Sequence, residues 1–139
     1  MPVQTYTGSC HCGAVRFEAH IDLDQGSNRC NCSYCSKVRA WFVFARGAES
    51  FRLLDGSGVS EYRWTPPGDS EPHLTFTFCR TCGVRTFARG ELESLGGTFH
   101  AVSVPALDLT PEQRVAIPVR YINGRDRRYD EAPKHPDAI

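Results

Sequence analysis

The sequence lacks an excess of charge, a long apolar run and a secretion signal. Sixteen basic and sixteen acidic side chains cancel over 139 residues, so the composition offers no overall attraction for nucleic acid or an anionic membrane. No apolar run approaches the roughly 20 residues that a spanning helix needs, and the N-terminal segment lacks the basic and apolar regions of a signal peptide. We therefore expect a cytoplasmic protein with neither nucleic-acid nor membrane partners.

Helical patterns are also scarce, whereas strand patterns recur along the chain. Val15, Phe17 and Ala19 alternate with polar residues, and residues 73–78 show the same period of two, which predicts half-buried strands. Further strands are predicted at residues 40–45, 51–54, 59–64, 84–88, 98–104 and 115–122. Pro118 places the last of these at a sheet edge, because proline cannot donate to a ladder.

One short helix is predicted after Thr110, which is followed by Pro111 and Gln113 in the pattern of a capped N-terminus. The chain has room for one core, so we expect a single mainly β domain over residues 1–124. Residues 125–139 are rich in Arg, Asp, Pro and Lys, and we interpret them as a C-terminal tail that follows the surface.

Cysteine is the residue type in which the sequence is unusually rich. Its seven cysteines form three groups, in the segments CHC at 10–12, CNCSYC at 30–35 and CRTC at 79–82. An odd number cannot all pair within one chain, and thiols stay reduced in the cytosol. Clustered cysteines in that setting indicate metal ligands or redox catalysts rather than structural disulfides.

The first and third groups together predict a closed metal site. A glycine follows the last cysteine of each group, at Gly13 and Gly83, where it allows a tight turn that aims backbone N–H groups at the sulfurs. Four thiolates form a closed tetrahedral zinc site. The predicted ligands are Cys10, Cys12, Cys79 and Cys82.

The middle group, Cys30, Cys32 and Cys35, supplies only three ligands. Three protein ligands leave one tetrahedral position open, as in catalytic zinc sites. We expect these three cysteines to hold a catalytic zinc. The alternatives are a fourth ligand such as His73 or His100 that closes the site, free or redox-active thiols, and a site without metal.

Two sets of residues near the clusters have a candidate role. Lys37 and Arg39 closely follow the open cluster and are the candidates for binding a substrate carboxylate. The aromatic residues beside the clusters are expected to pack in the core, with a pocket wall as the less favoured interpretation. They are Trp41, Phe42, Phe44, Phe76, Phe78 and Phe87.

Taken together, the three segments resemble a known family. The motifs GSCHCGAVRF at 8–17, CNCSYCSK at 30–37 and FCRTCG at 78–83 are similar in order and spacing to those of the glutathione-dependent formaldehyde-activating (GFA) enzymes. The resemblance covers residues 5–121 and implies a β-tent-like fold of zinc-stabilised antiparallel sheets with few short helices. It further implies one structural zinc, on the first and third groups, and a second zinc, on the middle group, where glutathione binds.

The activity implied by this resemblance is that of a carbon–sulfur lyase. Glutathione, or another thiol, adds to formaldehyde or a related aldehyde and forms an S-hydroxymethyl adduct. The expected partners are thus a small thiol and a small aldehyde, and zinc activation of the thiol requires no separate protein nucleophile.

Two other functions remain open from the sequence. A zinc-stabilised domain can act without catalysis as a binding module, as the centromere-protein-V relatives of the family illustrate. A thiol–disulfide oxidoreductase that uses Cys79 and Cys82 is less favoured, because such a motif normally begins a helix and here follows a predicted strand.

Overall fold

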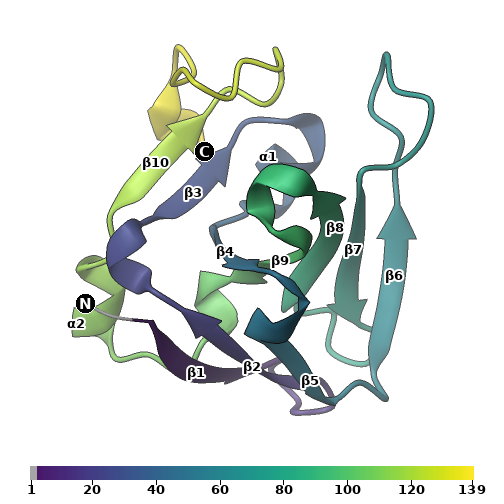
Figure 1. Cartoon of the computed structure of the whole chain (residues 1–139), viewed down its shortest axis with the longest axis vertical. Coiled ribbons are helices and arrows are strands. Elements are labelled where there is room, and N and C mark those ends of the chain that lie inside the picture. Colours follow the sequence, from purple (N-terminus) through teal and green to yellow (C-terminus); the bar gives the residue numbers. More distant parts are fainter. Residues whose placement is uncertain (1–2) are drawn as a thin grey trace.

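The computed structural model describes residues 3–139 and is mainly β, as predicted (Figure 1). Its strands are β1 Gln4–Ser9, β2 Arg16–Ile21, β3 Ser27–Cys30, β4 Phe42–Arg46, β5 Phe51–Asp55, β6 Val59–Arg63, β7 Leu74–Cys79, β8 Phe87–Leu92, β9 Gly97–Ser103 and β10 Val119–Ile122. The α-helices are α1 Ser33–Val38 and α2 Pro111–Val115. Short 3-10 turns lie at Leu23–Gln25, Ala48–Ser50, Glu93–Leu95, Val104–Ala106 and Pro136–Ala138.

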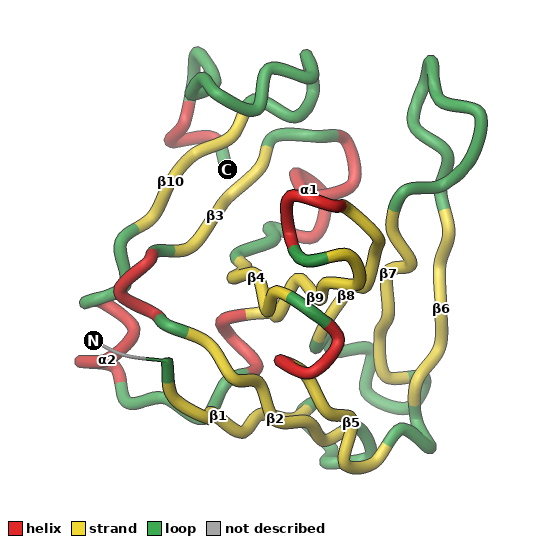
Figure 2. The backbone as a smooth tube through the Cα atoms, in the orientation of Figure 1, coloured by secondary structure: helices red, strands yellow, loops and turns green. Residues whose placement is uncertain are grey.

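The strands form two sheets that share one core. One sheet has the order β1-β2-β5, and the other has the order β10-β3-β4-β9-β8-β7-β6. Figure 2 shows the larger sheet curving round from β10 to β6, with the smaller sheet beneath it. Neighbouring strands are antiparallel except for β10 and β3, which run parallel.

The core between the sheets follows from the period of two in each strand. Phe17, Ala19 and Ile21 of β2 pack in one cluster with Val43 of β4 and Val102 of β9. Because side chains alternate across a strand, their neighbours on β4 and β9 point to the opposite face of the larger sheet. That second face carries the site described below.

Some local predictions were accurate. The capping box at Thr110 is present, with Pro111 in the first turn of α2, and β10 is an edge strand that begins directly after Pro118. Within residues 3–139, no helix combines the length and the apolar character needed to cross a bilayer.

Other elements differ from the prediction for identifiable reasons. The strands β1 and β3 and the helix α1 carry mixed polar sequences without a clear period. β1 is stabilised by pairing with the next strand, β2, and β3 by pairing with the distant β10. In α1, Tyr34 stacks on Phe76 of β7. The strand predicted at 84–88 lies later, at Phe87–Leu92, and the one predicted at 115–122 is confined to Val119–Ile122. The first part of that second segment completes α2 and a turn.

Candidate functional site

The first and third cysteine groups meet to form one cluster, although they lie far apart in the chain. Cys10 and Cys12 occupy the connection from β1 to β2, Cys79 ends β7, and Cys82 lies in the turn after it. Gly13 and Gly83 both have positive φ, 85° and 77°, a conformation that side chains disfavour. We call this group the four-cysteine cluster: Cys10, Cys12, Cys79 and Cys82.

The sulfur positions of the four-cysteine cluster fit a tetrahedral zinc ion. All four sulfurs lie within 4.8 Å of one another, and Cys12 Sγ is 3.7 Å from Cys10 Sγ and 3.6 Å from Cys79 Sγ. Tetrahedral bonds of about 2.3 Å place neighbouring sulfurs about 3.8 Å apart. Cys10 and Cys79 are buried, packed with Val15 and Phe87, which suits a closed structural site.

Backbone N–H groups surround these sulfurs and favour the thiolate form. The Val15 N–H donates to Cys10 Sγ at 3.3 Å, and the Thr81 N–H donates to Cys79 Sγ at 3.4 Å. Backbone N–H groups of Val84 and Cys12 lower the pKa of Cys82 to about 6. Donors aimed at an anion stabilise it, and zinc binds cysteine as the thiolate, so Cys82 is held in the charge state that a metal needs. The pKa of Cys12 is instead raised to about 11, because the lowering effect of the Ala14 N–H is outweighed by the neighbouring thiols of Cys79, Cys10 and Cys82 together with desolvation.

The three-cysteine cluster, Cys30, Cys32 and Cys35, is built within one short segment. Cys30 ends β3, Cys32 is the N-cap of α1, and Cys35 lies in the helix. The Cys32 N–H donates to Cys30 Sγ at 3.4 Å, and the Cys35 N–H donates to Cys32 Sγ at 3.3 Å. Thiol hydrogen bonds from Cys30 and Cys35, together with the N–H groups of the first helical turn, lower the pKa of Cys32 to about 3.

These three sulfurs also lie within 4.8 Å of one another and could hold a zinc ion. Among residues 3–139, no histidine or carboxylate joins them in such a group, so three ligands with an open position is the arrangement that the donors fit. His73 and His100, the candidate fourth ligands, are not members of this group. His73 contacts Asp69, with Nε2 to Oδ2 at 2.5 Å, and His100 stacks on Phe51.

Gly124 leaves space for the Cys30 sulfur of the three-cysteine cluster. A Cβ atom at this position would collide with Cys30 Sγ, and it would also contact the ring of Tyr129 and the Cβ atom of Cys32. The turn predicted at Asn123 and Gly124 therefore needs glycine because the backbone there lies against the Cys30 sulfur. Sequence reasoning identified the turn but not its closeness to Cys30.

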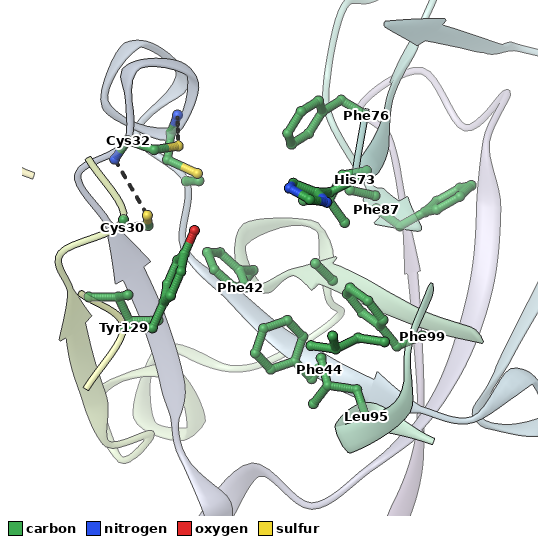
Figure 3. A pocket seen from close by; sticks show the side chains of 18 of the residues that line it. Cys30, Cys32, Phe42, Phe44, His73, Phe76, Phe87, Leu95, Phe99 and Tyr129 are labelled. Atoms are coloured by element: carbon green, nitrogen blue, oxygen red, sulfur yellow. Dashed lines mark hydrogen bonds between the residues drawn. The ribbon is translucent and has the colours of Figure 1, made fainter. Parts of the chain in front are cut away.

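A cavity of about 590 Å³ opens beside the three-cysteine cluster, and all three cysteines line it. Figure 3 shows Cys30 and Cys32 at one end, with Phe44, Leu95 and Phe99 farther along. The size lies within the usual range of small-molecule sites. The four-cysteine cluster contributes no residue to the lining of this cavity.

A comparison with models of known protein families matches residues 5–120 to the family described as glutathione-dependent formaldehyde-activating enzyme. The chain belongs to this family. The match covers all seven cysteines, so the predicted resemblance is confirmed. The family is named for an enzyme, and the two GFA cysteine clusters of this chain are compatible with zinc.

The aromatic residues of the GFA domain refine one expectation. Five of the six residues that were expected in the core line the cavity, and Phe78 does not. The lining members are Trp41, Phe42, Phe44, Phe76 and Phe87. Phe76 and Phe87 are buried as well, and Phe87 packs in the cluster behind the four-cysteine cluster, so core packing is confirmed for these two. Composition cannot distinguish a cavity wall from a core, because both are apolar. The difference arises because one face of the larger sheet packs against the smaller sheet, whereas the other face borders the cavity.

The positive charges near the GFA cavity are not the ones chosen from the sequence. Lys37 and Arg39 are exposed at the end of α1 and are not among the lining residues. Arg85, Arg120 and Arg127 line the cavity instead. They come from segments distant in sequence from the cysteines, so proximity along the chain offered no signal for them.

The C-terminal tail forms part of the cavity wall. Arg125 donates from its backbone N–H to the Asn31 side chain at 2.9 Å, which ties the tail to the loop after β3. Arg127 binds Asp69 in the β6–β7 connection, with Nη2 to Oδ2 at 2.6 Å, and holds the pKa of that carboxyl below its usual value. Tyr129 lines the cavity beside Cys30 (Figure 3).

Proposed function

We propose that this protein catalyses the reversible addition of a thiol, with glutathione as the expected thiol, to formaldehyde or a related aldehyde. The product is an S-hydroxymethyl-type adduct, and the reverse reaction is that of a carbon–sulfur lyase. The observation that carries the proposal is the position of the three-cysteine cluster at one end of a cavity large enough for two small reactants. A structural zinc site has no need of such a cavity, whereas a site for two small reactants does.

Cys30, Cys32 and Cys35 are the residues that would hold the catalytic zinc. A zinc ion bound by these cysteines would lower the pKa of a coordinated thiol and polarise a carbonyl oxygen. The chain contributes the environment for this chemistry. Backbone N–H groups donate to the sulfurs of Cys30 and Cys32, and the aromatic wall lowers the local dielectric constant, which strengthens electrostatic interactions inside the cavity.

Recognition of the thiol is assigned to the cavity wall and to the charges near it. Glutathione carries two carboxylates, which arginine binds well through its planar pair of N–H donors. Arg85 lines the cavity, and its Nε is buried without a hydrogen-bond partner within residues 3–139. A buried donor of this kind is suited to a ligand oxygen. Lys37 and Arg39 remain the alternative recognition pair.

The competing proposal is a zinc-stabilised module that binds another macromolecule without catalysis. An apolar cavity that opens on three thiols favours a small molecule over a flat protein surface. The oxidoreductase alternative receives less support, because Cys79 is fully buried within the four-cysteine cluster and a redox-active thiol needs access.

The test is exchange spectroscopy by NMR with glutathione and formaldehyde. The zinc-loaded protein should accelerate adduct formation and breakdown above the uncatalysed rate, and Cys35→Ser should abolish the acceleration. Ser36→Ala is the matched control, since Ser36 lies next to Cys35 in α1 but does not line the cavity. Two bound zinc ions with no acceleration would favour the binding module.

A further inference from the structure

The larger sheet presents one apolar face to the cavity. In β4, Val43 and Ala45 pack in the core, whereas Phe42 and Phe44 line the cavity. In β9, Val102 packs in the core, whereas Phe99 and Ala101 line the cavity. Each strand is therefore apolar on both faces, although only one face packs against the smaller sheet. Exposing apolar surface to water costs about 25 cal/mol per Å², so this second face favours an apolar occupant.

One apolar part of the wall, formed by Phe44, Leu95 and Phe99, lies away from the cysteines (Figure 3). Phe44 packs edge to face on Phe99, with ring centroids 5.6 Å apart, and Leu95 lines the same region (Figure 3). Formaldehyde has two heavy atoms and needs roughly the room of one or two water molecules, each about 30 Å³. It would leave this aromatic end of the cavity empty.

The positive charges stand on the cysteine side of the cavity. The Arg85 guanidinium lies 5.1 Å from the ring centre of Tyr34, the residue that precedes Cys35. Arg120 lies in β10, two positions before Ile122, which pairs with Cys30. The acidic lining residue within the described chain, Glu91, already accepts a hydrogen bond from the Thr98 hydroxyl at 2.6 Å. A charged thiol such as glutathione thus fits near the cysteines, and the aromatic end remains for the other reactant.

We infer that the aldehyde used by this protein carries an aromatic group of about phenyl size, which the aromatic end of the cavity binds. The inference rests on the proposed function and names the substrate class for it. In the reaction the thiol sulfur bonds to the carbonyl carbon, the carbon–oxygen double bond becomes single, and the thiol proton passes to the oxygen. Nothing is oxidised or reduced, and no further reactant is required.

Binding measurements test the aromatic end without depending on turnover. S-benzylglutathione and S-methylglutathione are stable thioethers that mimic the adducts of benzaldehyde and formaldehyde. Calorimetric titration of the zinc-loaded protein should give an affinity about 30-fold higher for the benzyl compound. One buried methylene raises affinity about tenfold or more, and a phenyl ring buries more apolar surface than one methylene. Affinities within twofold of each other would overturn the inference.

A filled cavity gives the second binding test. Ala101 lines the cavity between Phe44 of β4 and Ala88 of β8, so Ala101→Leu adds its extra atoms into open space. The ratio of the two affinities should fall from about 30 towards one. Ala116→Leu, an exposed change at the end of α2, is the matched control and should keep the ratio. A ratio unchanged by Ala101→Leu would place the phenyl group elsewhere and overturn the assignment.

Turnover with three reactant pairs separates this inference from the proposed function. Glutathione with benzaldehyde should be accelerated at least tenfold more than glutathione with formaldehyde, each relative to its uncatalysed rate. Acceleration of the formaldehyde pair alone would overturn the inference and leave the proposed function standing. Acceleration of neither pair would overturn both. Greater acceleration of benzyl mercaptan with formaldehyde would assign the apolar group to the thiol and overturn its assignment to the aldehyde.

Discussion

The two cysteine clusters use the same donor atom in opposite ways. The four-cysteine cluster joins segments 67 residues apart, between the smaller sheet and the larger one. The three-cysteine cluster lies within one segment at the start of α1. The first is packed against the core, whereas the second lines a cavity.

This difference separates stabilisation from reactivity. A bound metal that closes a long loop removes conformational freedom from the unfolded chain, so its binding energy becomes folding energy. A metal held by neighbouring residues restricts the unfolded chain far less. Its open position can serve a substrate, and the fold loses little when the metal leaves.

The largest expected effect is on stability. Cys82→Ser would remove one ligand from the proposed zinc site that links the smaller sheet to the larger one, and we expect it to lower Tm by about 10–20 °C. Cys35→Ser removes a ligand from the local cluster and should lower Tm by about 5 °C or less. Thermal unfolding of the two zinc-loaded variants measures the comparison, and equal losses would remove the distinction between the clusters.

Loss of metal should follow the same order. During mild chelation, native mass spectrometry should show the three-cysteine cluster releasing its zinc about tenfold faster, because three ligands bind more weakly than four and the open position admits the chelator. The released thiols lie close enough to oxidise to a disulfide. The Cys82→Ser and Cys35→Ser variants, each with one cluster impaired, identify which cluster loses its zinc first. Earlier release from the four-cysteine cluster would reverse the assignment of the structural and the open site.

Adding one methyl group at position 124 should remove zinc from the three-cysteine cluster and leave the four-cysteine cluster loaded. Gly124→Ala places a Cβ atom against Cys30 Sγ, so bound zinc should fall from about two to about one per chain while Tm changes little. Gly56→Ala is the control, because its closest atom belongs to the flexible end of the Leu53 side chain, which is 41% exposed. Elemental analysis that finds two zinc ions in the Gly124→Ala variant would contradict this placement.

Substrate charge should be recognised at the three-cysteine cluster alone. Arg85→Ala should weaken glutathione binding about tenfold, the loss expected for a charge-assisted hydrogen bond, with zinc content unchanged. Arg85→Lys should recover part of that loss.

The comparison for this experiment is the pair Lys37→Ala and Arg39→Gly. Glycine suits position 39, because Arg39 has a positive φ of 56°. We expect the affinity of this double variant for glutathione to fall about twofold, because exposed charges are screened by solvent and salt. A larger loss there than in Arg85→Ala would return recognition to Lys37 and Arg39.

The smallest effect concerns the packing behind the four-cysteine cluster. His100 stacks on Phe51 with ring centroids 4.1 Å apart, and burial lowers its pKa to about 4. The unfolded chain therefore takes up a proton first as the pH falls below about 6.5, and stability is lost between that value and about 4.

The matched variant is His100→Phe, which keeps the stacked ring and cannot titrate. Between pH 7.5 and 5 its Tm should fall a few degrees less than that of the natural protein, because the screened contribution of His100 is about 1 kcal/mol. Acid effects on the cysteines are common to both proteins and cancel in the difference. Identical pH profiles would show that His100 does not contribute.

Much of this protein was readable from its cysteines. Their number, spacing and following glycines predicted the division into four and three before any contact was known, because ligand spacing and turn geometry are local properties. The strands with strong alternation, β2 and β7, were predicted for the same reason. The capped start of α2 is equally local.

Only the tertiary structure decided what surrounds the three-cysteine cluster. Phe42 and Phe44 have the same sequence character as core residues, and they form a wall because the larger sheet curves around a cavity instead of meeting a third layer. Arg85 and Tyr129 join that wall from segments 50 or more residues away from Cys35, and no spacing in the sequence records such a meeting. The groups of cysteines that could hold a metal could be read from the chain because the spacing within each group is local, whereas the cavity beside the three-cysteine cluster depends on long-range packing.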